Sequence, residues 1–295
     1  MKYEQVHAAK GDASVRVACE ALGVSTTAYY DWLRRRQAPP TERELDDKRL
    51  KHEIRVAFDE GRGTYGRPRI QEALRARDIH VGANRIRRKM REMGLNAKPR
   101  RLFKNTTLSE HDERVASNLL ARNFTADAPN QVWVSDITYV RTWEGWVYAC
   151  FVIDLFSRKV VGWALDDHMR ADLVTRALDM AISRRSPPAG LILHSDRGSQ
   201  YVSKAVRRRV RRHHLVQSMS RRGDCFDNAV AESFHDKLKQ ELIYRGTWPN
   251  RQTAISAVVE YVERFYNPRR MHSTLNYMSP NEFELQHAAT TEAAA

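Results

Sequence analysis

The sequence has few cysteines and no long apolar segment. Only 3 cysteines occur in 295 residues, far apart and without C-x-x-C spacing, so neither a disulfide framework nor a cysteine zinc site is supported. The first residues lack the apolar core of a signal peptide, and no apolar run approaches the roughly 18 residues that cross a bilayer. We therefore expect a cytoplasmic protein with no membrane partner.

Acidic residues are too few to balance the basic ones. The chain has 50 Lys and Arg against 36 Asp and Glu, a net charge of +14, and the basic excess is larger in residues 1–125 than in 126–295. A basic surface binds polyanions because each Lys or Arg on a phosphate releases a condensed counterion. The charge therefore favours a nucleic-acid partner, and a solvated basic surface is the alternative.

Helical patterns fill the first third of the chain. Residues 13–22 carry apolar positions at helical spacing, Gly23 interrupts them, and Ser25 can cap a second helix that ends in arginines. This is a helix-turn-helix pattern, although any small helical hairpin looks similar. We assign the unit to residues 1–40 and expect a linker over 39–51.

A second helical unit is predicted over residues 41–100. Its last helix, over 83–95, has apolar side chains on one face and basic side chains mostly on the other. So dense a basic cluster exceeds what solubility requires, which favours contact with DNA phosphates over a solvated face. The predicted DNA-contacting residues are Arg85, Arg87, Arg88, Lys89 and Arg91. Residues 101–128 are expected to form a basic connector.

From residue 129 the periodicity becomes that of strands and helices together. Strands are predicted over 130–140, 146–154, 159–165, 191–195 and 215–219, and helices over 170–184, 203–214, 227–243 and 251–267. This order describes an α/β fold, a mixed five-stranded sheet with flanking helices. We assign 129–285 to one core with a C-terminal helical tail, and expect 286–295 to be disordered.

Three carboxylates in this core have unusual contexts. Asp136 lies in the middle of an apolar strand, where burial of a carboxylate is costly without a cation or donor. Asp196 follows a buried strand, and Glu232 lies on a helix that carries Lys239 two turns further along. Hard oxygen ligands fit Mg²⁺, or Mn²⁺ in its place, better than zinc. The contexts together predict a site for two Mg²⁺ ions beside a phosphodiester.

Longer segments accompany the carboxylates. They are Y-G-R-P-R-I (65–70), the stretch from 129–139 to 153–163, H-S-D-R-G-S-Q-Y (194–201), D-N-A-V-A-E-S-F (227–234) and the stretch 265–280. With these segments the chain resembles the DDE transposases and retroviral-type integrases. More narrowly, and over nearly its whole length, it resembles the second-reading-frame product (OrfB) of IS-three-family bacterial insertion sequences. The resemblance implies a ribonuclease-H-like core in a bacterial, nucleoid-associated protein.

The resemblance also implies roles for individual residues. Asp136, Asp196 and Glu232 would form the catalytic, metal-binding triad. Lys239 aligns with a residue that contacts the terminal DNA in such enzymes, and an ion pair with Asp236 is its alternative.

Other residues in the matching segments have less specific roles. Asp154 and Asp227 are interpreted as structural carboxylates, and His194 as a packed histidine rather than a ligand. Arg270 and His272 either approach DNA or fold back onto the core with the tail.

The implied function is that of a DNA transposase, which nicks insertion-sequence ends and transfers the 3′-OH strands. Its partners would be duplex DNA, namely terminal inverted repeats and target DNA, and further copies of itself on that DNA. A ribonuclease-H-like nuclease without strand transfer and a catalytically silent DNA-binding regulator are the alternatives. Such transposases are commonly fusions with an upstream helix-turn-helix and leucine zipper. We therefore expect an upstream-frame partner or fusion, unless residues 13–95 suffice.

Overall fold

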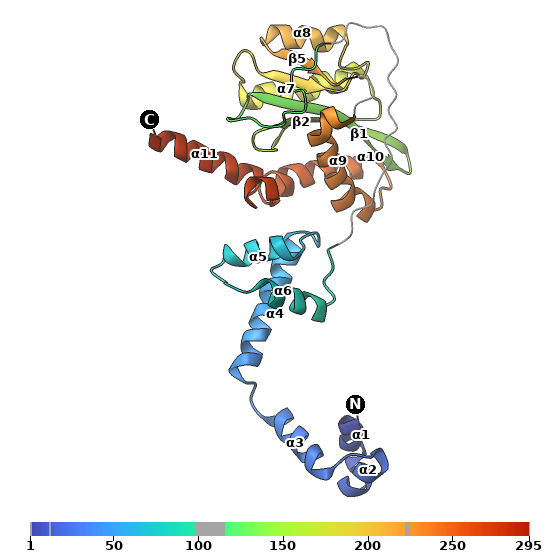
Figure 1. The fold of residues 1–295 in the computed structure, drawn as a ribbon. Coiled ribbons are helices and arrows are strands. Elements are labelled where there is room, and N and C mark those ends of the chain that lie inside the picture. Colours follow the sequence, from blue (N-terminus) through green and yellow to red (C-terminus); the bar gives the residue numbers. More distant parts are fainter. Residues whose placement is uncertain (1, 12, 98–115, 222–224, 295) are drawn as a thin grey trace.

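The structure is a computed structural model that describes residues 2–11, 13–97, 116–221 and 225–294. Figure 1 shows two helical units followed by a core built on a sheet. The first unit lies farthest from the sheet, and the second lies between them.

The first unit contains α1 (Lys2–Ala8), α2 (Val15–Leu22) and α3 (Thr26–Gln37). The side chain of Ser25 accepts a hydrogen bond from the Ala28 amide and so begins α3, as predicted. Gly23, with a φ of 62°, ends α2 in the left-handed conformation that glycine adopts easily. A small core around Val6 and Tyr29 joins the helices.

The second unit contains α4 (Glu42–Glu60), α5 (Arg67–Arg75) and α6 (Ala83–Glu92). The predicted linker over 39–51 is wrong from Glu42 onward. Thr41 and Glu44 form a reciprocal capping box that begins a long helix there. Leu50 and Ile54 of α4 then pack with the apolar faces of α5 and α6.

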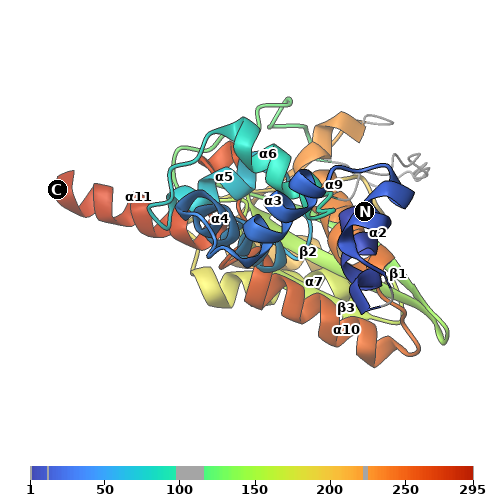
Figure 2. The ribbon, with the colours of Figure 1, turned by 90° about the horizontal axis from the view of Figure 1, so that it is seen from below.

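This second unit contacts the C-terminal part of the chain, and it lies in front of the core when the molecule is seen from below (Figure 2). The Tyr65 hydroxyl donates to the Arg269 carbonyl at 3.2 Å and accepts from the Met271 amide at 2.9 Å. Arg69 Nε donates to the Met271 carbonyl at 3.1 Å. The contacts fix α5 against the segment that follows the core helices.

The core sheet has five strands in the order β3-β2-β1-β4-β5. Their bounds are β1 (Val132–Thr142), β2 (Gly145–Asp154), β3 (Val160–Asp166), β4 (Ile192–Ser195) and β5 (Val216–Met219). The first three strands pair in antiparallel fashion, whereas β4 is parallel to β1 and β5 is parallel to β4. The predicted mixed five-stranded sheet is confirmed.

Helices cover both faces of the sheet. Trp133 packs with α7 (Ala171–Arg185) and α8 (Lys204–Arg212), whereas Val134 packs with α9 (Ala229–Glu241) and α10 (Arg251–Glu260). Successive residues of a strand point to opposite faces, so β1 contributes to both layers. We call the two sides the α7–α8 face and the α9–α10 face.

The chain ends in a helix rather than in a disordered tail. After α10, a π-helix (Tyr261–Tyr266) and a 3-10 turn (Ser273–Leu275) lead to α11 (Pro280–Ala294). The prediction of disorder over 286–295 is therefore wrong for residues 286–294. The side chains of Ser279 and Glu282 bond reciprocally to each other's amides and begin the helix. No described helix is both long and apolar enough to cross a membrane.

Candidate active site

Asp136 and Asp196 come directly after the last residues through which β1 and β4 pair with each other. The parallel register ends with Ser135 opposite Ser195, so the two carboxylates occupy the next position on neighbouring strands. Side chains alternate along a strand, which places both on the α9–α10 face with Val134 and Ile192. The fold thus brings together two residues that are far apart in sequence.

Local hydrogen bonds orient both carboxylates. Asp196 Oδ1 accepts from the Gly198 amide at 2.9 Å, in a turn that leads the chain away from β4. Asp136 Oδ1 accepts from the Ile137 amide at 2.8 Å. One oxygen of each side chain is therefore engaged by backbone.

Glu232 reaches this region from the first turns of α9. Phe234, two residues on, packs edge to face on Phe151 with ring centroids 4.8 Å apart. Phe151 lies directly opposite Asp136 in β2. This packing holds the N-terminal part of α9 over the strand that carries Asp136.

The other two carboxylates of the predicted triad repel Asp136. Burial, and next the charge of Asp196, raise the pKa of Asp136 well above its usual value, and Glu232 adds a smaller effect. Lys239 acts in the opposite direction. Burial and Asp236 also raise the pKa of Glu232. A divalent cation would relieve this repulsion, and three carboxylates fit a hard cation such as Mg²⁺.

His235 is a site residue that the sequence did not reveal. Its Nδ1 lies 3.4 Å from Asp136 Oδ2, on the side away from the Ile137 amide. Burial, with a smaller effect of Lys239, lowers the pKa of His235 to about 3, so the ring is neutral at physiological pH. Its position, three residues after Glu232 and so one turn along α9, is the only sequence signal for it.

A buried polar cluster supports the site from the α7–α8 face. Ser135 Oγ lies 2.9 Å from the Tyr201 hydroxyl and 3.6 Å from Cys150 Sγ. Tyr201 ends the segment that begins at His194, so this hydrogen bond ties the loop after Asp196 to the strand before Asp136. The cluster fixes the two carboxylate-bearing segments relative to each other.

His194 and the two other acids in the matching segments lie in structural positions. His194 is buried between Ser218 Oγ at 2.8 Å and the Asp227 carbonyl at 2.9 Å. Arg221 lowers the pKa of Asp227 to about 2 through a hydrogen bond. Asp154 accepts hydrogen bonds from the amides of Asn130 and Phe156. These contacts agree with the structural interpretation of all three.

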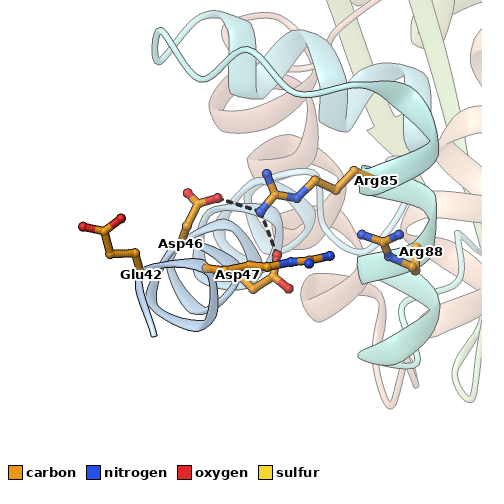
Figure 3. Close-up of a pocket in the computed structure, with 6 residues that line it drawn as sticks. Glu42, Asp46, Asp47, Arg85 and Arg88 are labelled. Atoms are coloured by element: carbon orange, nitrogen blue, oxygen red, sulfur yellow. Dashed lines mark hydrogen bonds and ion pairs between the residues drawn. The ribbon is translucent and has the colours of Figure 1, made fainter. Parts of the chain in front are cut away.

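Two predicted DNA-contacting residues of α6 are engaged within the protein. Arg85 Nη2 lies 2.6 Å from Asp46 and 2.7 Å from Asp47, as Figure 3 shows at the pocket lined by these residues. Lys89 is only 5% exposed, and its Nζ lies 2.7 Å from Asp47. The prediction of an outward-facing side chain is therefore wrong for Lys89, whereas Arg85 is half-buried and paired with acids of α4. Arg87, Arg88 and Arg91 are exposed and stay predicted contacts.

Arg270 and His272 fold back onto the core. Arg270 is 2% exposed, and its Nε and Nη2 lie 2.8 and 2.5 Å from the two Glu241 oxygens. His272 is also buried. The prediction that they approach DNA is corrected, because the buried carboxylate of Glu241 needs the guanidinium as its partner.

Lys239 extends from α9 toward β1. Its Nζ lies 4.9 Å from the centroid of the Tyr139 ring. Its charge also acts on Asp136. Lys239 is therefore near the carboxylates and directed toward an exposed aromatic side chain.

A second acidic cluster lies elsewhere on the core. Ligand atoms of Asp166, His168 and Asp172 lie within 4.8 Å of one another, and within the described ranges no other such group occurs. Arg176 forms ion pairs with both carboxylates of this cluster. An internal cation thus already balances these acids.

Known families match most of the chain. Residues 126–225 and 213–280 each match an integrase core domain, and residues 44–103 match an HTH-like domain.

Curated relatives match almost end to end. The chain is 45% identical over 265 residues to an uncharacterized 31 kDa protein of insertion element IS600 from Shigella sonnei, covering 90% of this chain and 96% of that protein. It is 37% identical over 289 residues to the transposase InsF for insertion sequence IS3A from Escherichia coli (strain K12), covering 98% of this chain and 100% of that protein.

Solved structures of retroviral integrases are also similar. The HTLV-2 integrase catalytic core domain in complex with magnesium (trimeric form) is 15% identical with a TM-score of 0.43, covering 54% of this chain and 99% of that one. The catalytic core domain of BIV integrase is 20% identical with a TM-score of 0.42, covering 55% of this chain and 99% of that one.

Proposed function

The chain belongs to the IS3 family of transposases, DDE polynucleotidyl transferases with an integrase core, and we propose that it nicks insertion-sequence ends and joins them to target DNA. The observation that carries this proposal is the position of Asp136 beside Asp196 on neighbouring strands, with the charge of Glu232 on α9 acting on Asp136. Repelling carboxylates in a basic chain suit the binding of metal and of a phosphodiester.

Asp136, Asp196 and Glu232 would hold two Mg²⁺ ions, with Mn²⁺ able to substitute. When bound, such ions activate an attacking oxygen and stabilise the leaving oxygen. The chain's own contribution is to orient the carboxylates. The amides of Ile137 and Gly198 do this by bonding to one oxygen of Asp136 and of Asp196.

Both proposed steps are in-line substitutions at phosphorus. In the first, a water oxygen bonds to the phosphorus at the element's end and loses a proton to solvent, while the bond to the 3′ oxygen breaks and that oxygen takes up a proton to become a 3′-OH. In the second, the oxygen of the liberated 3′-OH bonds to a target phosphorus and loses its proton, while the bond from that phosphorus to the target 3′ oxygen breaks and this oxygen takes up a proton. The number of phosphodiester bonds is conserved in the second step, so no nucleotide cofactor is needed.

DNA binding would be shared between units. We propose that residues 1–40 and 41–100 form two DNA-binding units, 101–128 a connector and 129–285 the catalytic unit. Arg87, Arg88 and Arg91 of α6 would contact phosphates, and Lys239 the terminal DNA. Assembly of several copies on DNA in the bacterial cytoplasm, with an upstream-frame partner or fusion, belongs to the same proposal.

The test is Asp136→Asn in the full chain, assayed on labelled insertion-sequence ends with Mg²⁺. We expect cleavage and strand transfer to be lost while DNA binding persists. Asp166→Asn is the matched control, because it alters the second acidic cluster by the same change. Strand-transfer activity in Asp136→Asn would overturn the assignment of the site. Cleavage by the unmodified chain without any joined product would favour a nuclease. DNA binding without cleavage or joining would favour a catalytically silent regulator.

A further inference from the structure

Two aromatic side chains near the carboxylates are exposed as a pair. Tyr139 of β1 is 46% exposed and Trp146 of β2 is 39% exposed. Their rings lie edge to face with centroids 5.1 Å apart. Single exposed apolar residues are ordinary on protein surfaces, but an ordered aromatic pair beside a proposed active site is typical of a binding surface.

Two cations flank this pair. Arg141 Cζ lies 5.5 Å from the Trp146 ring centroid, and Lys239 Nζ lies 4.9 Å from that of Tyr139. Arg141 is exposed and pairs with Trp146 in the β1–β2 register. We call these four residues the aromatic platform: Tyr139, Arg141, Trp146 and Lys239.

The platform and the carboxylates lie on either side of one strand. Tyr139 and Arg141 alternate with Asp136, so they point to the α7–α8 face while Asp136 points to the α9–α10 face. In the described part of the chain, β4 pairs with β1 only as far as Ser135, and the edge of β1 beyond Asp136 has no neighbouring strand there. Lys239 comes from the α9–α10 face and reaches Tyr139 across this edge.

We propose that the aromatic platform binds an unpaired base at the DNA end that is being processed. The base would stack on Tyr139 and Trp146, and Arg141 and Lys239 would contact the phosphates next to it. Stacking on aromatic rings tolerates any base, and cations nearby follow the backbone. The two strands of the end would separate around the free edge of β1, one toward the carboxylates and the other onto the platform.

This inference rests on the proposed function, since it takes DNA as the substrate. The experiment therefore measures binding of the full chain in EDTA, where metal-dependent cleavage does not contribute. The probes are a fully paired duplex and the same duplex with three unpaired nucleotides at one end, labelled there with 2-aminopurine. Loss of cleavage in Asp136→Asn is a separate measurement, so each proposal can fail alone.

We expect the unmodified chain to prefer the unpaired end and to quench 2-aminopurine. Tyr139→Ala and Trp146→Ala should each lower affinity for the unpaired end about 10-fold, because stacking on one aromatic side chain contributes on that scale. Binding to the paired duplex should change little. Tyr139→Phe and Trp146→Phe keep a ring and should retain the preference.

Trp143→Ala is the matched control. Trp143 is 76% exposed in the same hairpin, and no ring contact involves it within the described residues. Equal affinity of the unmodified chain for both probes would overturn the proposal. It would also be overturned if the Ala variants bound the unpaired end as tightly as the unmodified chain does, or if they lost affinity equally for both probes. A changed oligomeric state in the Ala variants, measured by sedimentation, would assign the surface to a second copy instead.

Discussion

His235 Nδ1 lies 3.4 Å from the Oδ2 atom of Asp136, while the Ile137 amide bonds to Oδ1. The carboxylate is therefore held from both sides. Because the histidine is neutral, this contact adds no positive charge that would compete with a metal ion. The imidazole is thus a positioning group for the proposed metal ligand.

Removal of this imidazole should weaken metal binding. We expect His235→Leu to raise the Mg²⁺ concentration for half-maximal cleavage about 10-fold, the usual effect of losing a group that orients a ligand. His235→Asn places an amide donor near the same position and should recover part of the loss. Titration of cleavage rate against Mg²⁺ measures both, and equal behaviour of the two variants would leave His235 with a packing role only.

The buried pair of Arg270 and Glu241 should dominate the stability of the C-terminal segment. Burial alone would raise the pKa of Glu241, but the hydrogen bonds and charge of Arg270 lower it below its usual value. Arg270→Met would leave this carboxylate buried without its cation, at a cost of about 3–5 kcal/mol. Urea unfolding of the full chain measures the loss.

A surface pair provides the control for that measurement. The side chains of Arg209 and Asp179 are partly exposed and lie 3.0 Å apart, and Arg209→Met should cost only about 0–1 kcal/mol. Adding Glu241→Leu to Arg270→Met should restore stability, because it removes the uncompensated charge. If the double variant is no more stable than Arg270→Met, the penalty comes from lost packing instead.

The strand pattern and the carboxylate contexts could be predicted from sequence, because they depend on local periodicity. Alternating apolar residues around Asp136 predicted a strand, and the sheet contains it as β1. The segments around Asp196 and Glu232 predicted a strand end and a helix, which are also present.

Partners distant in sequence could not be predicted. Nothing in the residues near Arg270 indicates that Glu241 accepts its hydrogen bonds, and nothing near Lys89 indicates Asp47. Both basic residues were therefore predicted to contact DNA. The start of α4 was not predicted for another reason. The adjacent prolines and the charged stretch after them were interpreted as a linker, although Thr41 and Glu44 form a capping box there.

The cluster around Asp47 should give α4 and α6 an acid-sensitive contact. Hydrogen bonds from Lys89, and next from Arg85, lower the pKa of Asp47 to about 2. An unfolded Asp has a pKa of about 3.9. Because the folded value is the lower one, the stabilisation is present above about pH 4 and is lost as the pH falls toward about 2.

Comparison of Asp47→Asn with the unmodified chain tests this linkage. The melting temperature of the variant should be lower at pH 6, and the difference should shrink as the pH falls to 3. Asp59→Asn, on the same helix but outside the cluster, should show no such trend. A difference that stays constant between pH 6 and pH 3 would show that the ion pairs do not stabilise the fold.

The Tyr65 hydroxyl should control how firmly the second helical unit is held on the core. It donates to Arg269 and accepts from the Met271 amide, so Tyr65→Phe removes both hydrogen bonds with little change in shape. Each such bond contributes about 1 kcal/mol, so exchange of the Met271 amide with deuterium should speed up by about 5-fold or more. Tyr30→Phe, at an exposed site in the first unit, should leave that exchange unchanged.

Arg270 lies between Arg269 and Met271 in the sequence. Faster exchange of the Met271 amide in Tyr65→Phe together with slower DNA cleavage would therefore indicate that docking of α5 supports the catalytic core. Faster exchange with normal cleavage would restrict the contact to a role in stability.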